Sequence, residues 1–156
     1  MAQHLKLRKA QYGDVQAVYN LSNDPFVRKN SINQASIPFC QHERWFDERL
    51  TDPNTLFYIA EDEVGNFVGQ ARFQKDCDFW IVSISVVSQF RGKHLSGILL
   101  SEALKQSNVA PIRAIVRRNN IPSLMIFEHN GFKVEESKAL SQDFVSLVLT
   151  TSKEAG

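Results

Sequence analysis

The sequence predicts an α/β (α+β) fold with a mixed, mostly antiparallel central sheet of about seven strands flanked by about four helices. Segments such as 81–86 alternate apolar and small polar residues with the period of two that is typical of a half-buried strand. Segments such as 95–104 instead carry an apolar stripe at helical spacing. A hairpin precedes a strand–helix–strand unit, so we expect antiparallel and parallel pairing in one sheet, with helices on both faces.

The expected elements follow one another as strand, two helices, three strands, helix, strand, helix and two strands. We expect strands at 4–9, 57–61, 67–75, 81–86, 112–116 and 144–150, with one more between the last helix and the final strand. We expect helices after Asp14, at 41–50, at 95–104 and from about Asn120. The segment between the first two helices is expected to be irregular.

Capping and turn residues set the ends of these elements. Asp14 is a candidate cap for the first helix, and Pro25 ends it because the residue before a proline disfavours helical geometry. The sequence Glu-Val-Gly-Asn at 63–66 is expected to form a hairpin turn. Gly131 followed by Phe132 is typical of a left-handed cap that closes the last helix.

Length and charge limit the classes of function. We expect one domain over residues 1–156 and, with a formal net charge of +1, no nucleic-acid or membrane partner. The first ten residues lack the apolar core of a secretory signal, and no stretch approaches the roughly 20 apolar residues of a membrane span. Cys40 and Cys77 have no metal-ligand spacing, so we expect no metal site and a cytoplasmic protein with two reduced thiols.

The strand at 81–86 runs into the basic, glycine-containing turn 89–93, and a helix follows at once. The first-turn N–H groups of a helix have no intrahelical partner, and the helix dipole attracts negative charge to that end. This junction is therefore expected to bind an anion, such as the pyrophosphate of a nucleotide-like cofactor.

Two motifs resemble those of the GNAT superfamily of N-acetyltransferases. VVSQFRGKHLSGILL, at 86–100, is similar to the family's acetyl-coenzyme A loop, and NIPSLMIFEHNGF, at 120–132, is similar to its last helix. The resemblance extends from about Leu5 to Thr150. It implies a GNAT-like fold, acetyl-coenzyme A as cofactor, and direct transfer of acetyl to a primary amine.

The resemblance also implies a set of cofactor-binding residues. The main chain at the end of the strand would pair with the pantetheine arm, the loop would hold the pyrophosphate, and the last helix would face the cofactor from the opposite side. The residues concerned are Val86 and Val87; Arg91, Gly92, Lys93, His94, Leu95, Ser96 and Gly97; and Asn120, Ser123 and Phe127. Asn120 and Ser123 have a plainer reading as a helix cap and its first turn.

Three positions depart from the family pattern. His94 stands where the family has glycine, and Ser96 stands where it has glycine or alanine. Histidine is among the few residues other than glycine that are enriched at positive φ, so we expect the loop conformation to survive. Phe127 stands where a tyrosine often protonates the leaving thiolate, so the usual general acid is missing.

The segment 23–46 resembles the branch that acetylates UDP-linked 4-amino sugars of the pseudaminic acid pathway and, less closely, the ribosomal-protein acetyltransferases. By this resemblance Arg28 would contact a diphosphate, Trp45 would stack on uracil, and His42 would relay the amine proton. Asn23 belongs to the same pattern, and Ser85 faces the expected cleft. Surface or core roles remain the alternatives for Arg28, Trp45 and His42, and for Ser85 the alternative is a small residue that simply leaves room.

Three functions follow from this resemblance. The favoured one is an acetyl-coenzyme A dependent N-acetyltransferase whose small-molecule amine is carried on a nucleotide-linked sugar. The second is a protein N-terminal acetyltransferase of the ribosomal type, which an acidic groove would favour. The third is a coenzyme A binding module without catalysis. A homodimer is one assembly that the sequence leaves open.

Overall fold

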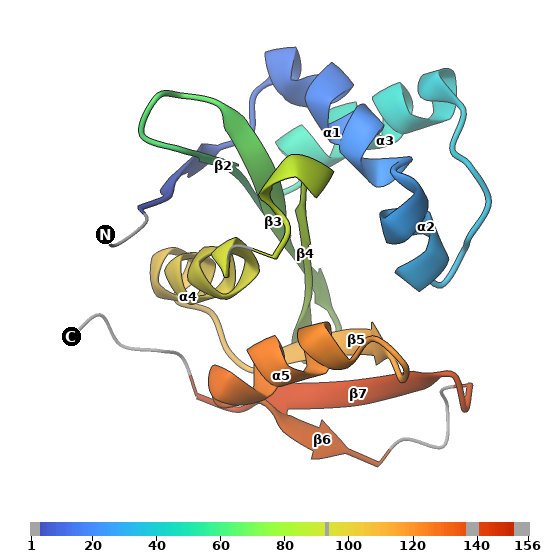
Figure 1. Cartoon of the computed structure of the whole chain (residues 1–156), viewed down its shortest axis with the longest axis vertical. Coiled ribbons are helices and arrows are strands. Elements are labelled where there is room, and N and C mark those ends of the chain that lie inside the picture. The colour runs from blue at the N-terminus through green and yellow to red at the C-terminus, as the bar shows by residue number, and fades with distance from the viewer. Residues whose placement is uncertain (1–3, 93, 137–140, 152–156) are drawn as a thin grey trace.

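The computed structural model describes residues 4–92, 94–136 and 141–151, and its centre is one seven-stranded sheet with the strand order β1-β2-β3-β4-β5-β7-β6 (Figure 1). The strands are β1 (Lys6–Lys9), β2 (Thr55–Glu61), β3 (Phe67–Asp76), β4 (Phe79–Val86), β5 (Ile112–Arg117), β6 (Lys133–Glu135) and β7 (Phe144–Leu149). Every neighbouring pair is antiparallel except β4 and β5, which run parallel. The predicted fold class, a mixed and mostly antiparallel sheet, is confirmed.

Helices cover both faces of this sheet, as predicted (Figure 1). They are α1 (Val15–Ser22), α2 (Pro25–Asn30), α3 (Phe39–Thr51), α4 (Leu95–Ser107) and α5 (Ile121–His129), with short 3-10 turns at Tyr12–Asp14 and Ser88–Phe90. None of the helices in the described ranges is long and apolar enough to cross a membrane.

Strand β2 divides the core into two clusters, because its successive side chains point to opposite faces. Phe57 and Ile59 pack with Val18 and Phe46 from α1 and α3. Tyr58 and Ala60 join the larger cluster, to which α4 contributes Leu99 and neighbouring apolar residues. The sheet therefore has an α1–α3 face and an α4–α5 face, each with its own apolar layer.

Two local predictions need correction. Residues 25–30, expected to be irregular, form helix α2, because Asp24 accepts hydrogen bonds from the N–H groups of Phe26 and Val27 and Pro25 suits the first helical turn. Asp14 does not cap α1 with its side chain; its carboxylate pairs with Arg8 at 2.8 Å.

Two other local predictions are confirmed. The hairpin between β2 and β3 forms around Gly65, whose φ is +97°. Gly131 closes α5 at φ +94°, and the Phe132 N–H donates to the Phe127 carbonyl.

Candidate functional site

The two parallel strands in the middle of the sheet separate soon after they meet. Strands β4 and β5 pair only at Trp80, Ile81 and Val82 of β4, and the last of these faces Ala114. Beyond these three pairs both strands continue, β4 to Val86 and β5 to Arg117, without pairing to one another. The open edges form a splay into which an extended ligand with amide groups can hydrogen bond as a strand does.

The direction of the β4 backbone shows which groups face the splay. The Val87 N–H donates to the Val68 carbonyl of β3 at 2.9 Å. Since backbone groups alternate in direction along a strand, Ile84 and Val86 direct their N–H and C=O groups to the other edge, toward β5. The backbone of Val86 therefore faces the splay, and so does that of Ile84, which sequence reasoning did not name. The Val87 N–H is bonded to β3, and pairing of this strand end with pantetheine stays a prediction.

The predicted cofactor loop has the geometry of an anion cradle. Gly92 lies at φ +78° and His94 at φ +63°, and α4 begins directly after His94 with no side chain of the described residues capping it. The first N–H groups of α4, at Leu95, Ser96 and Gly97, are thus available to a ligand. A Cβ built on Gly92 or Gly97 would meet nothing within 4 Å, so there is open room beside the loop. Lys93, also predicted here, lies outside the described residues.

The positive φ of His94 confirms the expectation that histidine can replace glycine in this loop, but at a cost in strain. His94→Gly should therefore raise the stability of the protein by up to about 1 kcal/mol and its melting temperature by about 2–4 °C. His94→Ala keeps the strain and should give no gain. Thermal denaturation monitored by circular dichroism checks both variants, and equal melting temperatures for glycine and alanine would contradict this account.

Arg91, predicted to lie near the pyrophosphate, makes contacts within the protein. Its Nε donates to the Val86 carbonyl at 3.0 Å, and its guanidinium pairs with Asp24 at 2.9 Å and lies 4.7 Å from the ring centre of Phe26. Burial alone would raise the pKa of the Asp24 carboxyl, but the hydrogen bond and charge of Arg91 outweigh it and hold that pKa below its usual value. Arg91 therefore joins the cofactor loop to α2.

The last helix approaches the splay with its N-terminus, through residues that also serve the fold. Asn120 caps α5 by accepting a hydrogen bond from the Ser123 N–H at 3.4 Å, the plainer of its two predicted roles. Phe127 is 3% exposed and packs edge-to-face on Phe132, with 5.1 Å between ring centres. Its cofactor contact stays a prediction, and its position offers no hydroxyl for proton transfer.

Polar side chains line the α1–α3 face beside the splay. Strand pairing aligns Gln70 with Ser85 and Arg72 with Ser83, and the Gln70 amide donates to the Ser85 hydroxyl at 2.9 Å. The other amide atom of Gln70, Oε1, is buried without a partner among the described residues. Because the Ser85 oxygen accepts from Gln70, its own hydrogen is free to point elsewhere, and the predicted contact of Ser85 with the acceptor stays a prediction.

Two arginines on this face flank β4. Burial, followed by the charge of Arg49, lowers the pKa of Arg72 to about 10, so that Arg72 stays charged at neutral pH. No carboxylate of the described residues forms an ion pair with Arg72 or with Arg117 of β5. The Arg117 Nε is buried without a partner. Sequence reasoning missed both arginines, since only the strand register shows that they share a face with Ser83 and Ser85.

Two predicted acceptor residues instead hold the segment 23–37 together. The Asn23 side chain exchanges two hydrogen bonds with the backbone of Ile37, at 2.7 and 3.0 Å. Arg28 donates to the carbonyls of Ser22, Asn33 and Ala35 and to the Ser31 hydroxyl. Most N–H groups of Arg28 are hydrogen bonded within its own segment, so Arg28 has few left to bind a diphosphate.

His42 and Trp45 lie in an aromatic cluster on the α1–α3 face. His42 is 2% exposed, and its ring stacks on Phe46 with 5.9 Å between centres. Burial and the charge of Arg72 lower the pKa of His42, against a hydrogen bond to the Val15 carbonyl. Arg72 covers the Trp45 ring at 4.7 Å, which leaves that ring a poor platform for a base. Proton relay by His42 stays a prediction, and any amine must reach it through this cluster.

The lowered pKa of His42 makes stability depend on pH in a defined direction. The unfolded chain gains this proton near the ordinary pKa of about 6.5, before the folded protein does. Stability is therefore complete above that pH and falls as the pH drops below it. His42→Phe, which keeps an aromatic ring, should narrow the difference in melting temperature between pH 7.5 and 5.5. An unchanged difference would show that other groups cause the acid sensitivity.

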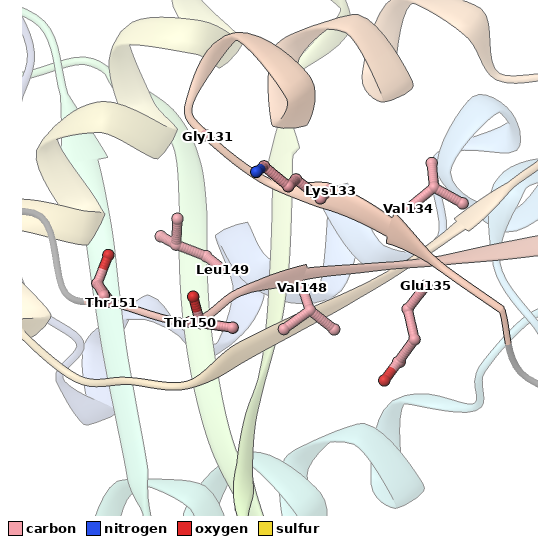
Figure 2. A pocket seen from close by; sticks show the side chains of 8 residues that line it. All are labelled: Gly131, Lys133, Val134, Glu135, Val148, Leu149, Thr150 and Thr151. Carbon is pink, nitrogen blue, oxygen red and sulfur yellow. The ribbon is translucent and has the colours of Figure 1, made fainter.

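A separate hollow of about 530 Å³ lies against the end of β7 and the α5–β6 turn (Figure 2). Two charged residues line it, Lys133 and Glu135, and Figure 2 shows their side chains pointing away from one another. Glu135 is already paired with Arg113 at 3.2 Å. The hollow contains none of the predicted site residues and offers no converging chemistry.

Comparison with known proteins gives consistent matches. The model of the acetyltransferase (GNAT) family matches residues 15–132. YwnH of Bacillus subtilis, named as a phosphinothricin acetyltransferase, is 30% identical over 142 residues, covering 82% of this chain and 83% of YwnH. The spermidine N(1)-acetyltransferase of Vibrio cholerae is 22% identical over 156 residues, covering 94% of this chain and 88% of its own.

Solved structures support the same fold. A crystal structure of the Vibrio cholerae spermidine N-acetyltransferase in complex with CoA and spermine superposes with a TM-score of 0.83 at 20% identity, covering 94% of this chain and 95% of that one. These matches support the predicted family but not its sugar-acetylating branch, because the relatives found act, by their names, on phosphinothricin and on spermidine.

Proposed function

The chain belongs to the GNAT family of acetyltransferases, and we propose that it moves acetyl from acetyl-coenzyme A to the primary amine of a small acceptor that also carries an acidic group. Acetyl-coenzyme A supplies the acetyl group as a thioester when bound. The residues that would hold it are Ile84 and Val86, whose backbone is not paired with β5, for the pantetheine arm, and the loop from Gly92 to Gly97 for the pyrophosphate. The Val86 carbonyl already accepts from Arg91, so the N–H is the backbone group that Val86 would offer to the ligand.

The chain's own contribution to the reaction is mainly placement. An amine held against a thioester reacts faster because the translational and rotational entropy is already lost. Ser85, which Gln70 fixes, has a hydroxyl hydrogen to donate one residue before Val86, at the tip of β4. Phe127, which stands where the family often has a tyrosine, could not protonate the coenzyme A sulfur, and a thiol with a pKa of about 8.5 would leave without that proton.

The acceptor class rests on one observation, the charge of the α1–α3 face. Arg72 is a cation whose pKa burial has lowered, and it has no carboxylate partner among the described residues. Arg72 donates to Gln74 at 2.7 Å and lies over the Trp45 ring, but neither contact supplies a negative charge. An anionic group on the acceptor would supply it. Two carboxylates near the splay, Asp24 and Glu135, are each already paired with an arginine.

This charge favours one acceptor class over the others. Phosphinothricin, in the name of one relative, is an amino acid with acidic groups, whereas spermidine, in the name of another, is a polycation. A polycation beside Arg72 and Arg117 would meet like charge.

A direct test measures thiol release from acetyl-coenzyme A with phosphinothricin, spermidine and a short peptide with a free N-terminus. We expect kcat/KM for phosphinothricin to exceed that for spermidine by at least about tenfold, since like-charge contacts cost several kcal/mol. A preference for spermidine would overturn the acceptor class while leaving the acetyltransferase reaction intact.

Calorimetry with acetyl-coenzyme A alone tests the underlying reaction. Binding is expected with the wild-type chain, and its absence would contradict the proposed function. Binding without turnover across all three acceptors would instead favour a coenzyme A binding module, for which the loss of the tyrosine at Phe127 provides a reason.

A further inference from the structure

Helix α2 and the turn after it bridge the two diverging strands of the splay. At the N-terminal end, Asp24 pairs with Arg91, whose Nε also bonds the Val86 carbonyl at the tip of β4. At the C-terminal end, the Ser31 carbonyl accepts from Arg117, at the tip of β5, at 3.0 Å. One support therefore stands on each branch of the splay, and Figure 1 shows α2 beside β4 and above β5.

We propose that Asp24 and Arg91 are positioning residues that couple acetyl-coenzyme A binding to the order of α2 and hence to acceptor binding. The proposal rests on the proposed function and adds that binding of one substrate favours binding of the other. A cofactor held by the backbone of β4 and by the loop after it would order that loop, which carries Arg91. Arg91 pairs with Asp24 at the start of α2, so the order of the loop would pass directly to α2.

The contacts have the properties that such coupling needs. The side chains of Arg91 and Asp24 are 25% and 19% exposed, so water screens their attraction only in part. Arg91 lies within the cofactor loop itself, so ordering of that loop acts on α2 without an intermediate element. The segment 23–37 is internally braced by Asn23 and Arg28 and can respond as one body. Coupling is reciprocal, so an acceptor that orders α2 should also tighten acetyl-coenzyme A binding.

Hydrogen exchange of the segment 24–37, with and without saturating acetyl-coenzyme A, tests the coupling without any knowledge of the acceptor. In the wild-type chain the cofactor should slow exchange there by at least about fivefold, the lower end of ordinary coupling energies. An unchanged exchange rate at saturation would overturn the proposal. Failure of the cofactor to bind would be a different result, seen in calorimetry, and would remove the proposed function and the coupling together.

Asp24→Asn separates coupling from simple support of the fold. Asparagine keeps the side-chain oxygen that caps α2 but loses the charge that faces Arg91. We expect acetyl-coenzyme A still to bind, while the protection of 24–37 disappears. Asp24→Glu keeps the carboxylate and should restore part of the protection. Full protection in Asp24→Asn would overturn the proposal, and so would equal loss in both variants.

The matched control is Asp52→Asn. Asp52 pairs with Arg49 at 3.0 Å, with side-chain exposures of 24% and 21%, close to those of the Asp24–Arg91 pair. It joins the end of α3 to the start of β2, and none of its hydrogen bonds or ion pairs in the described part of the chain involves the cofactor loop. Protection of 24–37 should be retained in this variant, and its loss would show that any broken ion pair has the same effect.

Discussion

Gly69→Ala is expected to weaken acetyl-coenzyme A binding at least about tenfold and to lower the free energy of unfolding by about 1–3 kcal/mol, as overpacking of a core does. A Cβ on Gly69 would collide with the Ser85 carbonyl oxygen and would lie 3.1 Å from the Val86 Cα. Backbone cannot swing aside as a side-chain end can, so the tip of β4 must move. That tip carries the groups proposed to hold pantetheine, and a misplacement of about 1 Å can cost a hundredfold in rate.

Gly13→Ala is the control for this prediction, because a Cβ on Gly13 meets nothing within 4 Å and the residue does not adopt a positive φ. That variant should keep its stability and its affinity. Chemical denaturation measures the first quantity and calorimetry the second. Normal cofactor affinity in a folded Gly69→Ala protein would mean that the tip of β4 takes no part in binding.

Arg117→Gln is expected to lower kcat/KM for an acidic acceptor by about 10- to 100-fold, because hydrogen bonds to charged groups contribute about 1.5–3 kcal/mol. The KM for acetyl-coenzyme A should change less than the KM for the acceptor. The Nε of Arg117 is buried without a partner, and its guanidinium lies 4.5 Å from the ring centre of Phe144, which holds it in place. Steady-state kinetics with each substrate varied in turn separates the two effects.

Arg118→Gln removes the same charge one residue further along the chain. Arg118 is exposed and donates to the Gln142 carbonyl at 2.8 Å, so its loss should leave the acceptor KM unchanged. Two amines of similar size, with and without acidic groups, provide a second comparison. If Arg117→Gln affects both amines equally, the arginine supports the segment at Ser31 and does not recognise an anion.

The sequence was sufficient for the sheet and most helices because their signals are local. Alternation along 81–86 and the stripe along 95–104 reflect burial on one side of each element, and the structure has β4 and α4 there. Helix α2 was missed for a physical reason as well. Its six residues are too few to carry a helical period, and its stability comes from Asp24 and Arg91, which lie far apart in the sequence.

The site could be predicted only where it depends on backbone geometry. The loop around His94 follows from a short motif and from φ preferences, and its left-handed conformation was foreseen. Side-chain roles were less accessible, because Arg28 and Asn23 turned out to brace their own segment. Arg72 and Arg117 lie on the same face of the sheet only because of the pairing register of β3, β4 and β5. No single stretch of the sequence encodes that register.

Only three residue pairs join β4 to β5 in the described part of the chain, and this short pairing affects how stable the protein is in a cell. A ligand that binds between these strands stabilises the native state by mass action. The free energy of unfolding rises by about 2.7 kcal/mol when the ligand concentration is a hundred times its Kd. Differences of that size alter how often a chain unfolds and meets a protease, and so change abundance several-fold. The amount of this enzyme should therefore follow the supply of its acetyl donor, falling in starved cells even when synthesis is constant.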